Sequence, residues 1–393
     1  MKRIFAPLAF SMFTSNLGMG IVAPLLSIYA RDMGASGVWI GLVMASYAIA
    51  NIVSTPLFGR LSDRKGRKLF LMAGLLAYAF ISLGYIFAPN LPLLCFMRLL
   101  HGAAGGMVLP IASAYIGDVS PKGQEGKWMG YASAAFYSGF GVGPLLGGVM
   151  SQYGGMNFAF AFMAGLNFLA MLIIYFFLPE TEARQSRIPT QRTSIKEMLK
   201  SKIVSGLFSY QIAAAVSQGS YITFLPIIGM AKGLSLTMVG IIISATMSLM
   251  SLMGTVAGRV ADRFNKRWLI VGGSCLIITA LFLIPHSDLF WVILALALLL
   301  ALGAGTANPA IAALSVTEGR KFGMGSTMGV VNMGLSIGFA VGPIIAGRVV
   351  DLGETSFAFY FGAGMLCLGV IVFFWLTSRQ SSTGKSSSNS SGF

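Results

Sequence analysis

Two ionisable residues, Arg98 and His101, lie three positions apart inside an otherwise apolar run. At this spacing both side chains project from nearly one face of a helix. Histidine titrates near physiological pH, so His101 is suited to carrying a proton, whereas Arg98 can pair with an anionic group or orient backbone carbonyls. A charged side chain inside an apolar membrane segment is energetically costly, which favours a role for these residues in coupling or recognition. A hydrogen-bonded core histidine is an equal alternative for His101.

A second charged group interrupts the apolar sequence in the run GRLSDRKGRK, which begins at Gly59 and includes Gly66. Asp63 is placed where a carboxylate can cap the positive N-terminus of another helix. Together with Arg64 and Arg67 it predicts a charge latch that holds one side of the protein shut. The alternative for the arginines is that they only fix the topology.

A shorter echo of this run, GRVADR, occurs 199 residues later and contains Asp262 and Arg263. It lacks the glycine that follows in the first copy. We therefore expect a weaker second latch.

Glycines recur along the run 127–152, where they remove side chains from one helix face and let a neighbouring helix approach closely. Pro144 frees a backbone carbonyl and permits a bend. A tight seam that can bend suits a gate, and a purely structural glycine face is the alternative. The gating residues expected in this run are Gly130, Gly139, Gly143, Pro144, Gly147 and Gly148.

Polar residues within other apolar runs are candidates for lining a cavity. Gln211, Gln218 and Tyr221 share one helical stripe through their spacings of seven and three. Asn16, Asn332 and Asn308, which precedes Pro309, add hydrogen-bonding groups. With Arg98 they form the expected substrate-binding set, although about half of such groups serve helix packing instead.

These residues must be positioned by membrane-spanning helices. The chain is 56% hydrophobic and only 10% charged, against the usual ~25% charged for a soluble protein. A run of about 20 apolar residues spans a bilayer, and its backbone must be helical there. We predict twelve such helices, at 4–30, 37–58, 69–89, 91–117, 127–152, 157–178, 203–231, 236–257, 268–286, 289–316, 323–349 and 356–377.

The chain contains an internal repeat, because a shift of 199 residues aligns glycines with glycines and prolines with prolines along its length. Gly41 matches Gly240, and Pro144 matches Pro343. Such matches indicate shared backbone constraints and not merely shared hydrophobicity. The repeat predicts six helices per half: an N-terminal bundle at 1–178, a cytoplasmic linker at 179–202, a C-terminal bundle at 203–377 and a disordered tail at 378–393.

The positive charges predict the orientation. With the N-terminus inside, 23 of the 27 lysines and arginines lie on the cytoplasmic side, three lie outside and Arg98 lies within a helix. This asymmetry predicts that both termini are cytoplasmic. It also explains the net charge of +15 without nucleic acid as a partner.

Metal and cofactor sites are not expected. The three cysteines lie in separate apolar runs without CxxC spacing, so they read as packing residues. All twelve acidic residues lie in predicted loops or at helix ends. No nucleophile and base are paired, so an enzyme is not expected.

Duplicated six-helix halves with a GxLxDRxGRK loop resemble the major facilitator superfamily, whose members move small solutes by alternating access. The glycines and proline of 130–148 match the motif of its drug:proton antiporters, and Arg98 and His101 stand in a run similar to its RxxxG element. The resemblance implies two six-helix bundles around a midplane cavity, with Asp63 capping the eleventh helix near Gly323.

The resemblance predicts a monomer in the cytoplasmic membrane that exports amphipathic, drug-like molecules by proton antiport, with protons and a small-molecule substrate as its partners. One departure weakens this expectation: related exporters keep an acid in the first helix, where this chain reads Ser15-Asn16-Leu17-Gly18. The alternative is a facilitator or dedicated exporter of a neutral or anionic metabolite. A receptor or lipid scramblase on the same fold is a further possibility.

Overall fold

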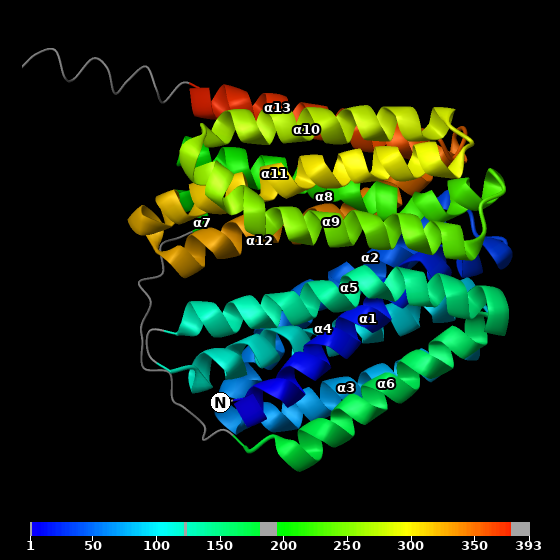
Figure 1. Cartoon of the computed structure of the whole chain (residues 1–393), viewed down its shortest axis with the longest axis vertical. Coiled ribbons are helices and arrows are strands. Elements are labelled where there is room, and N and C mark those ends of the chain that lie inside the picture. Colours follow the sequence, from blue (N-terminus) through cyan, green and yellow to red (C-terminus); the bar gives the residue numbers. More distant parts are fainter. Residues whose placement is uncertain (1, 122–123, 181–194, 379–393) are drawn as a thin grey trace, which may run out of the picture. The chain divides into compact units, whose positions relative to one another are not determined.

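The computed structural model describes residues 2–121, 124–180 and 195–378, and every regular element in this part of the chain is a helix (Figure 1). Within the helices, the side chains of residues 2, 125–126, 254–263 and 324–325 are outside the description. The elements are α1 (Lys2–Asp32), α2 (Gly37–Lys65), α3 (Arg67–Ile86), α4 (Leu91–Val119), α5 (Glu125–Gly154), α6 (Met156–Phe177), α7 (Ile195–Met198), α8 (Lys202–Ala231), α9 (Leu236–Arg263), α10 (Lys266–Leu283), η1 (Ile284–His286), α11 (Phe290–Phe322), α12 (Met324–Asp351) and α13 (Phe357–Ser378).

Twelve of these helices correspond to the twelve predicted runs. Over the described residues, eleven are long and apolar enough to cross a membrane. The twelfth, α5, has 30 residues but a glycine-rich sequence, and glycine contributes little hydropathy. The all-helical fold predicted from the sequence is confirmed.

Helix ends follow local sequence signals. Ser36 and Asn90 accept hydrogen bonds from the backbone N–H groups of Trp39 and Leu93 and so cap α2 and α4. Gly66 separates α2 from α3 with a φ of 93°, a backbone conformation that favours glycine. The predicted loop at 59–68 is therefore shorter than expected, because α2 continues to Lys65 before this break.

The helices group into two compact units. The first contains α1 to α6 with residues 222–248 and 343–355, which are the end of α8, the first half of α9 and the end of α12. Within it, α1 packs against α4, α5 and α6, α2 packs against α4, and α3 packs against α4 and α6.

The second unit contains the first part of α8, the second half of α9, α10, α11, most of α12, and α13. In it α10 packs against α11 and α13. Gly273 and Gly303 face each other's backbone, which allows α10 and α11 to approach closely. A buried cluster that includes Leu207, Tyr210 and Phe373 fills its core.

The division into bundles at 1–178 and 203–377 stays a prediction. In the predicted linker, α7 is described and buries Met198 against Val204 and Val330. Residues 181–194 of the linker and residues 379–393 of the tail lie outside the described residues.

Candidate functional site

Arg98 and His101 lie on α4, and each side chain is only 1% exposed. The Arg98 Nε donates to the backbone oxygen of Val43 in α2 at 3.3 Å, and its Nη1 lies 3.7 Å from the sulfur of Met19 in α1. The guanidinium also stands 5.0 Å from the ring centre of Tyr47, a cation–π distance. In the part of the chain that the structure describes, every recorded contact of this cation is to a neutral group.

Three tyrosines from two helices enclose the His101 ring. The hydroxyl of Tyr85 lies 2.8 Å from His101 Nδ1. The rings of Tyr78 and Tyr47 meet the imidazole edge to face, at centroid distances of 4.5 and 5.5 Å. We call His101 with Tyr47, Tyr78 and Tyr85 the tyrosine box.

The tyrosine box is closed on one side by Gly105. A Cβ there would lie 2.6 Å from the Tyr47 hydroxyl and 2.9 Å from both the Tyr78 hydroxyl and the Asn51 amide nitrogen. Three polar groups therefore converge where α4 has no side chain. The absence of a side chain at Gly105 therefore makes room for these groups.

Sequence reasoning missed these tyrosines, although one signal was available. Tyr78 and Tyr85 are seven residues apart in the third predicted helix, so they share one face. Buried tyrosine hydroxyls require polar partners. In the neighbouring apolar run, Arg98 and His101 were the ionisable side chains that could have been expected to serve as these partners.

The other predicted substrate-binding residues fall in different surroundings. Asn16, in the first unit, is buried and donates to the backbone oxygen of Met12 at 2.8 Å. In the second unit, the buried Tyr221 ring meets Phe359 of α13 edge to face at 6.5 Å. Gln211 lies beside Gly334 of α12.

Gln218 is partly buried on α8, whereas Asn308 near the middle of α11 and Asn332 in the first third of α12 are exposed. An amide at this depth is costly in lipid. Exposed amides of this kind fit a water-filled path better than a lipid-facing surface.

Three predicted gating glycines of α5 lie directly on α1. Cβ atoms at Gly139, Gly143 and Gly147 would press on the backbone of α1 between Phe13 and Ile21. On the α1 side, Gly20 meets the Pro144 ring, where a Cβ would be 2.9 Å away. We call this contact the α1–α5 seam.

Gly148 and the Pro144 carbonyl face the first half of α9 instead. A Cβ at Gly148 would lie 2.5 Å from the backbone oxygen of Leu236, and Gly240 leaves no room for a Cβ against the Pro144 oxygen. Gly130, in contrast, has open space around it. It is the one glycine of the predicted gating set on α5 without a close neighbour among the described residues.

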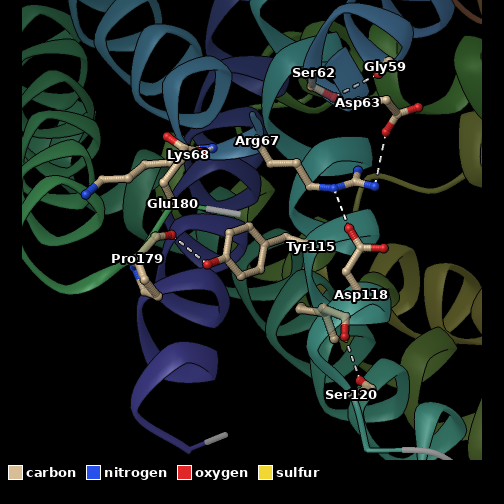
Figure 2. Close-up of polar contacts among 11 residues, drawn as sticks. Gly59, Ser62, Asp63, Arg67, Lys68, Tyr115, Asp118, Ser120, Pro179 and Glu180 are labelled. Carbon is tan, nitrogen blue, oxygen red and sulfur yellow. Dashed lines mark hydrogen bonds and ion pairs between the residues drawn. The ribbon is translucent and has the colours of Figure 1, made fainter. Parts of the chain in front are cut away.

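Figure 2 shows the charged network at the basic end of α2. Arg67 bridges two carboxylates: its Nη2 lies 3.1 Å from Asp63, and its Nε lies 2.7 Å from Asp118 at the end of α4. Arg64 is exposed, and Gly59 accepts a hydrogen bond from the Ser62 hydroxyl at its backbone oxygen. The predicted capping of the helix near Gly323 by Asp63 concerns the other unit and stays a prediction.

Glu180, three residues after the end of α6, binds the start of α3 (Figure 2). Its Oε1 accepts from the Lys68 backbone N–H at 3.2 Å, and a Cβ at Gly66 would lie 2.6 Å from that oxygen. The neighbouring Pro179 carbonyl accepts from the Tyr115 hydroxyl at 2.7 Å. Residues 179–180 thus tie the chain after α6 to α3 and α4.

Gly66→Ala is expected to displace Glu180 from the start of α3 and to strain the positive φ of this residue. Together these effects should cost about 1–3 kcal/mol of stability, measured as a lower melting temperature of the purified protein. Gly59→Ala is the matched control, since nothing lies within 4 Å of a Cβ at Gly59. Equal melting temperatures for the two variants would refute this role of Gly66.

The predicted second latch cannot be placed in this way. Asp262 and Arg263 belong to the last turn of α9, and their side chains lie outside the described residues.

The helices are those of a multi-pass membrane protein, and the chain belongs to the Major Facilitator Superfamily. The family model matches residues 8–318 and 207–391. The protein is therefore a multi-pass integral membrane protein and a secondary transporter of small molecules, not an enzyme.

Similarity extends along nearly the whole chain. An uncharacterized MFS-type transporter, MJ1560, from Methanocaldococcus jannaschii is 28% identical over 89% of this chain and 92% of its own length. The quinolone resistance protein NorA of Staphylococcus aureus is 28% identical over 94% of this chain and 95% of its own. The crystal structure of a mutant of the nucleoside transporter NupG superposes with a TM-score of 0.82 at 14% identity, covering 95% of this chain and all of NupG.

Proposed function

We propose that the protein exports amphipathic, drug-like small molecules by proton antiport. It does so as a monomer in the cytoplasmic membrane with both termini inside. The observation that supports this most is the α1–α5 seam, because three glycines of the antiporter-type motif, Gly139, Gly143 and Gly147, lie on the backbone of α1. A seam without side chains lets two helices slide or bend against each other while staying in contact. The similarity to NorA, a quinolone resistance protein, agrees with export.

Proton coupling is assigned to His101 and Arg98. The Tyr85 hydroxyl at His101 Nδ1 gives the ring a polar partner that can donate to it or accept from it. Arg98, one helical turn away on α4, contacts both α1 and α2. Proton uptake by His101 would therefore place a second positive charge beside a cation that touches the seam helix α1.

Substrate recognition is assigned to Arg98 and to the polar side chains within the membrane helices. Asn16, Gln211, Gln218, Tyr221, Asn308 and Asn332 offer hydrogen bonds within helices that are otherwise apolar. Amphipathic molecules match such a mixture, since a mostly apolar pocket with a few polar groups is the usual form of a small-molecule site.

The second candidate function is a facilitator or dedicated exporter of one neutral or anionic metabolite. The observation that favours it is the neutral surroundings of Arg98 among the described residues. An anionic substrate would supply the missing opposite charge. No carboxylate-based proton coupling is needed in this case.

The test is solute-evoked proton movement in energised inverted vesicles, followed with a pH-sensitive dye. Cationic, neutral and anionic solutes are added in turn. We expect proton release with the parent protein and none with His101→Ala. His286→Ala is the control, because His286 is the only other histidine of the chain and is exposed at the end of η1. If the parent releases no protons while a labelled solute moves independently of the gradient, the facilitator replaces the antiporter.

A further inference from the structure

The N-terminus of α2 is capped by a side chain that is distant in sequence. Asp351, the last residue of α12, accepts from the Gly37 N–H at 2.5 Å with Oδ1 and from the Val38 N–H at 3.0 Å with Oδ2. The Ser36 hydroxyl accepts from the next N–H, that of Trp39, at 3.5 Å. Three backbone donors that a helix leaves unpaired are thus satisfied, two of them by α12.

The N-terminus of α9 repeats this arrangement 199 residues later. The Ser235 hydroxyl accepts from the Met238 N–H at 3.2 Å. The side-chain oxygen of Gln152, near the end of α5, accepts from the Thr237 N–H at 3.2 Å. Gln152 occupies the position in the first repeat that Asp351 occupies in the second.

Glycine contacts adjoin both caps. Gly41 of α2 leaves no room for a Cβ against the Pro343 oxygen of α12, and its repeat partner Gly240 does the same against the Pro144 oxygen of α5. Each cap therefore ends a close helix crossing, α2 with α12 and α5 with α9. All the residues of both crossings belong to the first compact unit.

The two crossings differ in charge. Asp351 brings a carboxylate to two N–H groups at a helix N-terminus, where the helix dipole favours negative charge. Gln152 brings one neutral acceptor to one N–H. The α5–α9 crossing has instead a hydrogen bond from the Leu145 N–H to the Ser244 hydroxyl at 2.9 Å, and the repeat partner of Ser244 is Ala45.

We propose that these crossings are two unequal latches of the outer gate, and that Asp351 is the positioning residue that dominates its closure. They lie at the ends of α2 and α9 opposite the basic loops, which is the outer side in the topology that the charges predict. Opening this side requires both caps to break, and the α2 cap loses a charge-assisted pair. The inference rests on alternating access and on this topology, and not on the proposed substrate or proton coupling.

The substitution Ala45→Cys supplies a thiol whose labelling reports opening. Ala45 is fully buried and lies one helical turn after Gly41, on the same face of α2. A membrane-impermeant maleimide applied to right-side-out vesicles reaches it only when the α2–α12 crossing separates. Labelling of the parent, which has its three native cysteines, is subtracted.

Asp351→Asn in this background is expected to raise the labelling rate about fivefold, the effect on a two-state equilibrium of losing a helix cap. Glu354→Gln removes the same charge from an exposed residue three positions further along the chain and should leave the rate unchanged. Gln152→Glu adds a carboxylate at the second crossing and should lower the rate, which tests the proposal without weakening the fold. Equal rates for Asp351→Asn and its parent, or an equal rise with Glu354→Gln, would overturn the proposal. Neither substrate nor a proton gradient is present, so the outcome is independent of the antiport test.

Discussion

Gly143→Ala is expected to abolish transport and to lower the melting temperature. The new Cβ would lie 2.5 Å from the Leu17 oxygen and 2.8 Å from the Gly20 Cα. Both are backbone atoms, so no side chain can rotate to relieve the overlap, and α1 and α5 must move apart. Overpacking of this kind costs about 1–3 kcal/mol. Transport is measured as solute uptake into inverted vesicles, and stability as thermal unfolding in detergent.

Gly130→Ala is the matched control for this substitution. It changes the same residue type on the same helix, and Gly130 has open space where the Cβ would go. Alanine is the better helix former by about 0.5–1 kcal/mol, so this variant should be as stable as the parent or more so and should transport normally. Normal transport by Gly143→Ala would show that the α1–α5 seam does not move during the cycle.

Arg98→Met is expected to remove transport without removing stability. Methionine keeps much of the length of the side chain and loses the charge, whose recorded contacts are all neutral in the described part of the chain. Burying a charge without an opposite charge is costly, so an apolar side chain of similar length should not lower the stability. Because a costly buried charge is kept for its function, solute uptake by Arg98→Met should fall to the background of empty vesicles.

Arg98→Lys separates charge from geometry in the same measurements. Lysine keeps the positive charge but lacks the planar guanidinium group, which lies over the Tyr47 ring and contacts both α1 and α2. Partial transport is expected. If Arg98→Met transports like the parent, or if it unfolds several degrees earlier, the arginine is a structural residue and the assignment to coupling is wrong.

The helices and the repeat follow from the sequence because hydropathy and backbone constraints are local properties. Runs of apolar residues must be helical in lipid, and glycine at Gly41 and Gly240 marks a close crossing whatever its partner is. The same reasoning placed the end of α2 too early, because the charged side chains of 59–65 do not prevent a helix from continuing beyond the membrane. Only Gly66 ends it, through its positive φ.

The surroundings of the candidate site could be predicted only in part. The pairing of Arg98 with His101 on one face follows from their spacing, but the tyrosine box combines α2, α3 and α4, and no spacing along one helix identifies the partners on another. The caps at Asp351 and Gln152 join residues 314 and 85 positions apart. The repeat could have indicated them, since both stand at the same position of their halves and Ser36 and Ser235 mark the helices that they cap.

The central claim is that the protein is a proton-driven exporter, and accumulation of solute tests it most directly. A labelled amphipathic solute is supplied to inverted vesicles containing the protein, with a pH gradient that is either imposed or collapsed by an ionophore. We predict that the solute accumulates inside above its external concentration only while the gradient persists. Entry that stops at equal concentrations, with or without the gradient, would contradict antiport and leave the facilitator as the function of this protein.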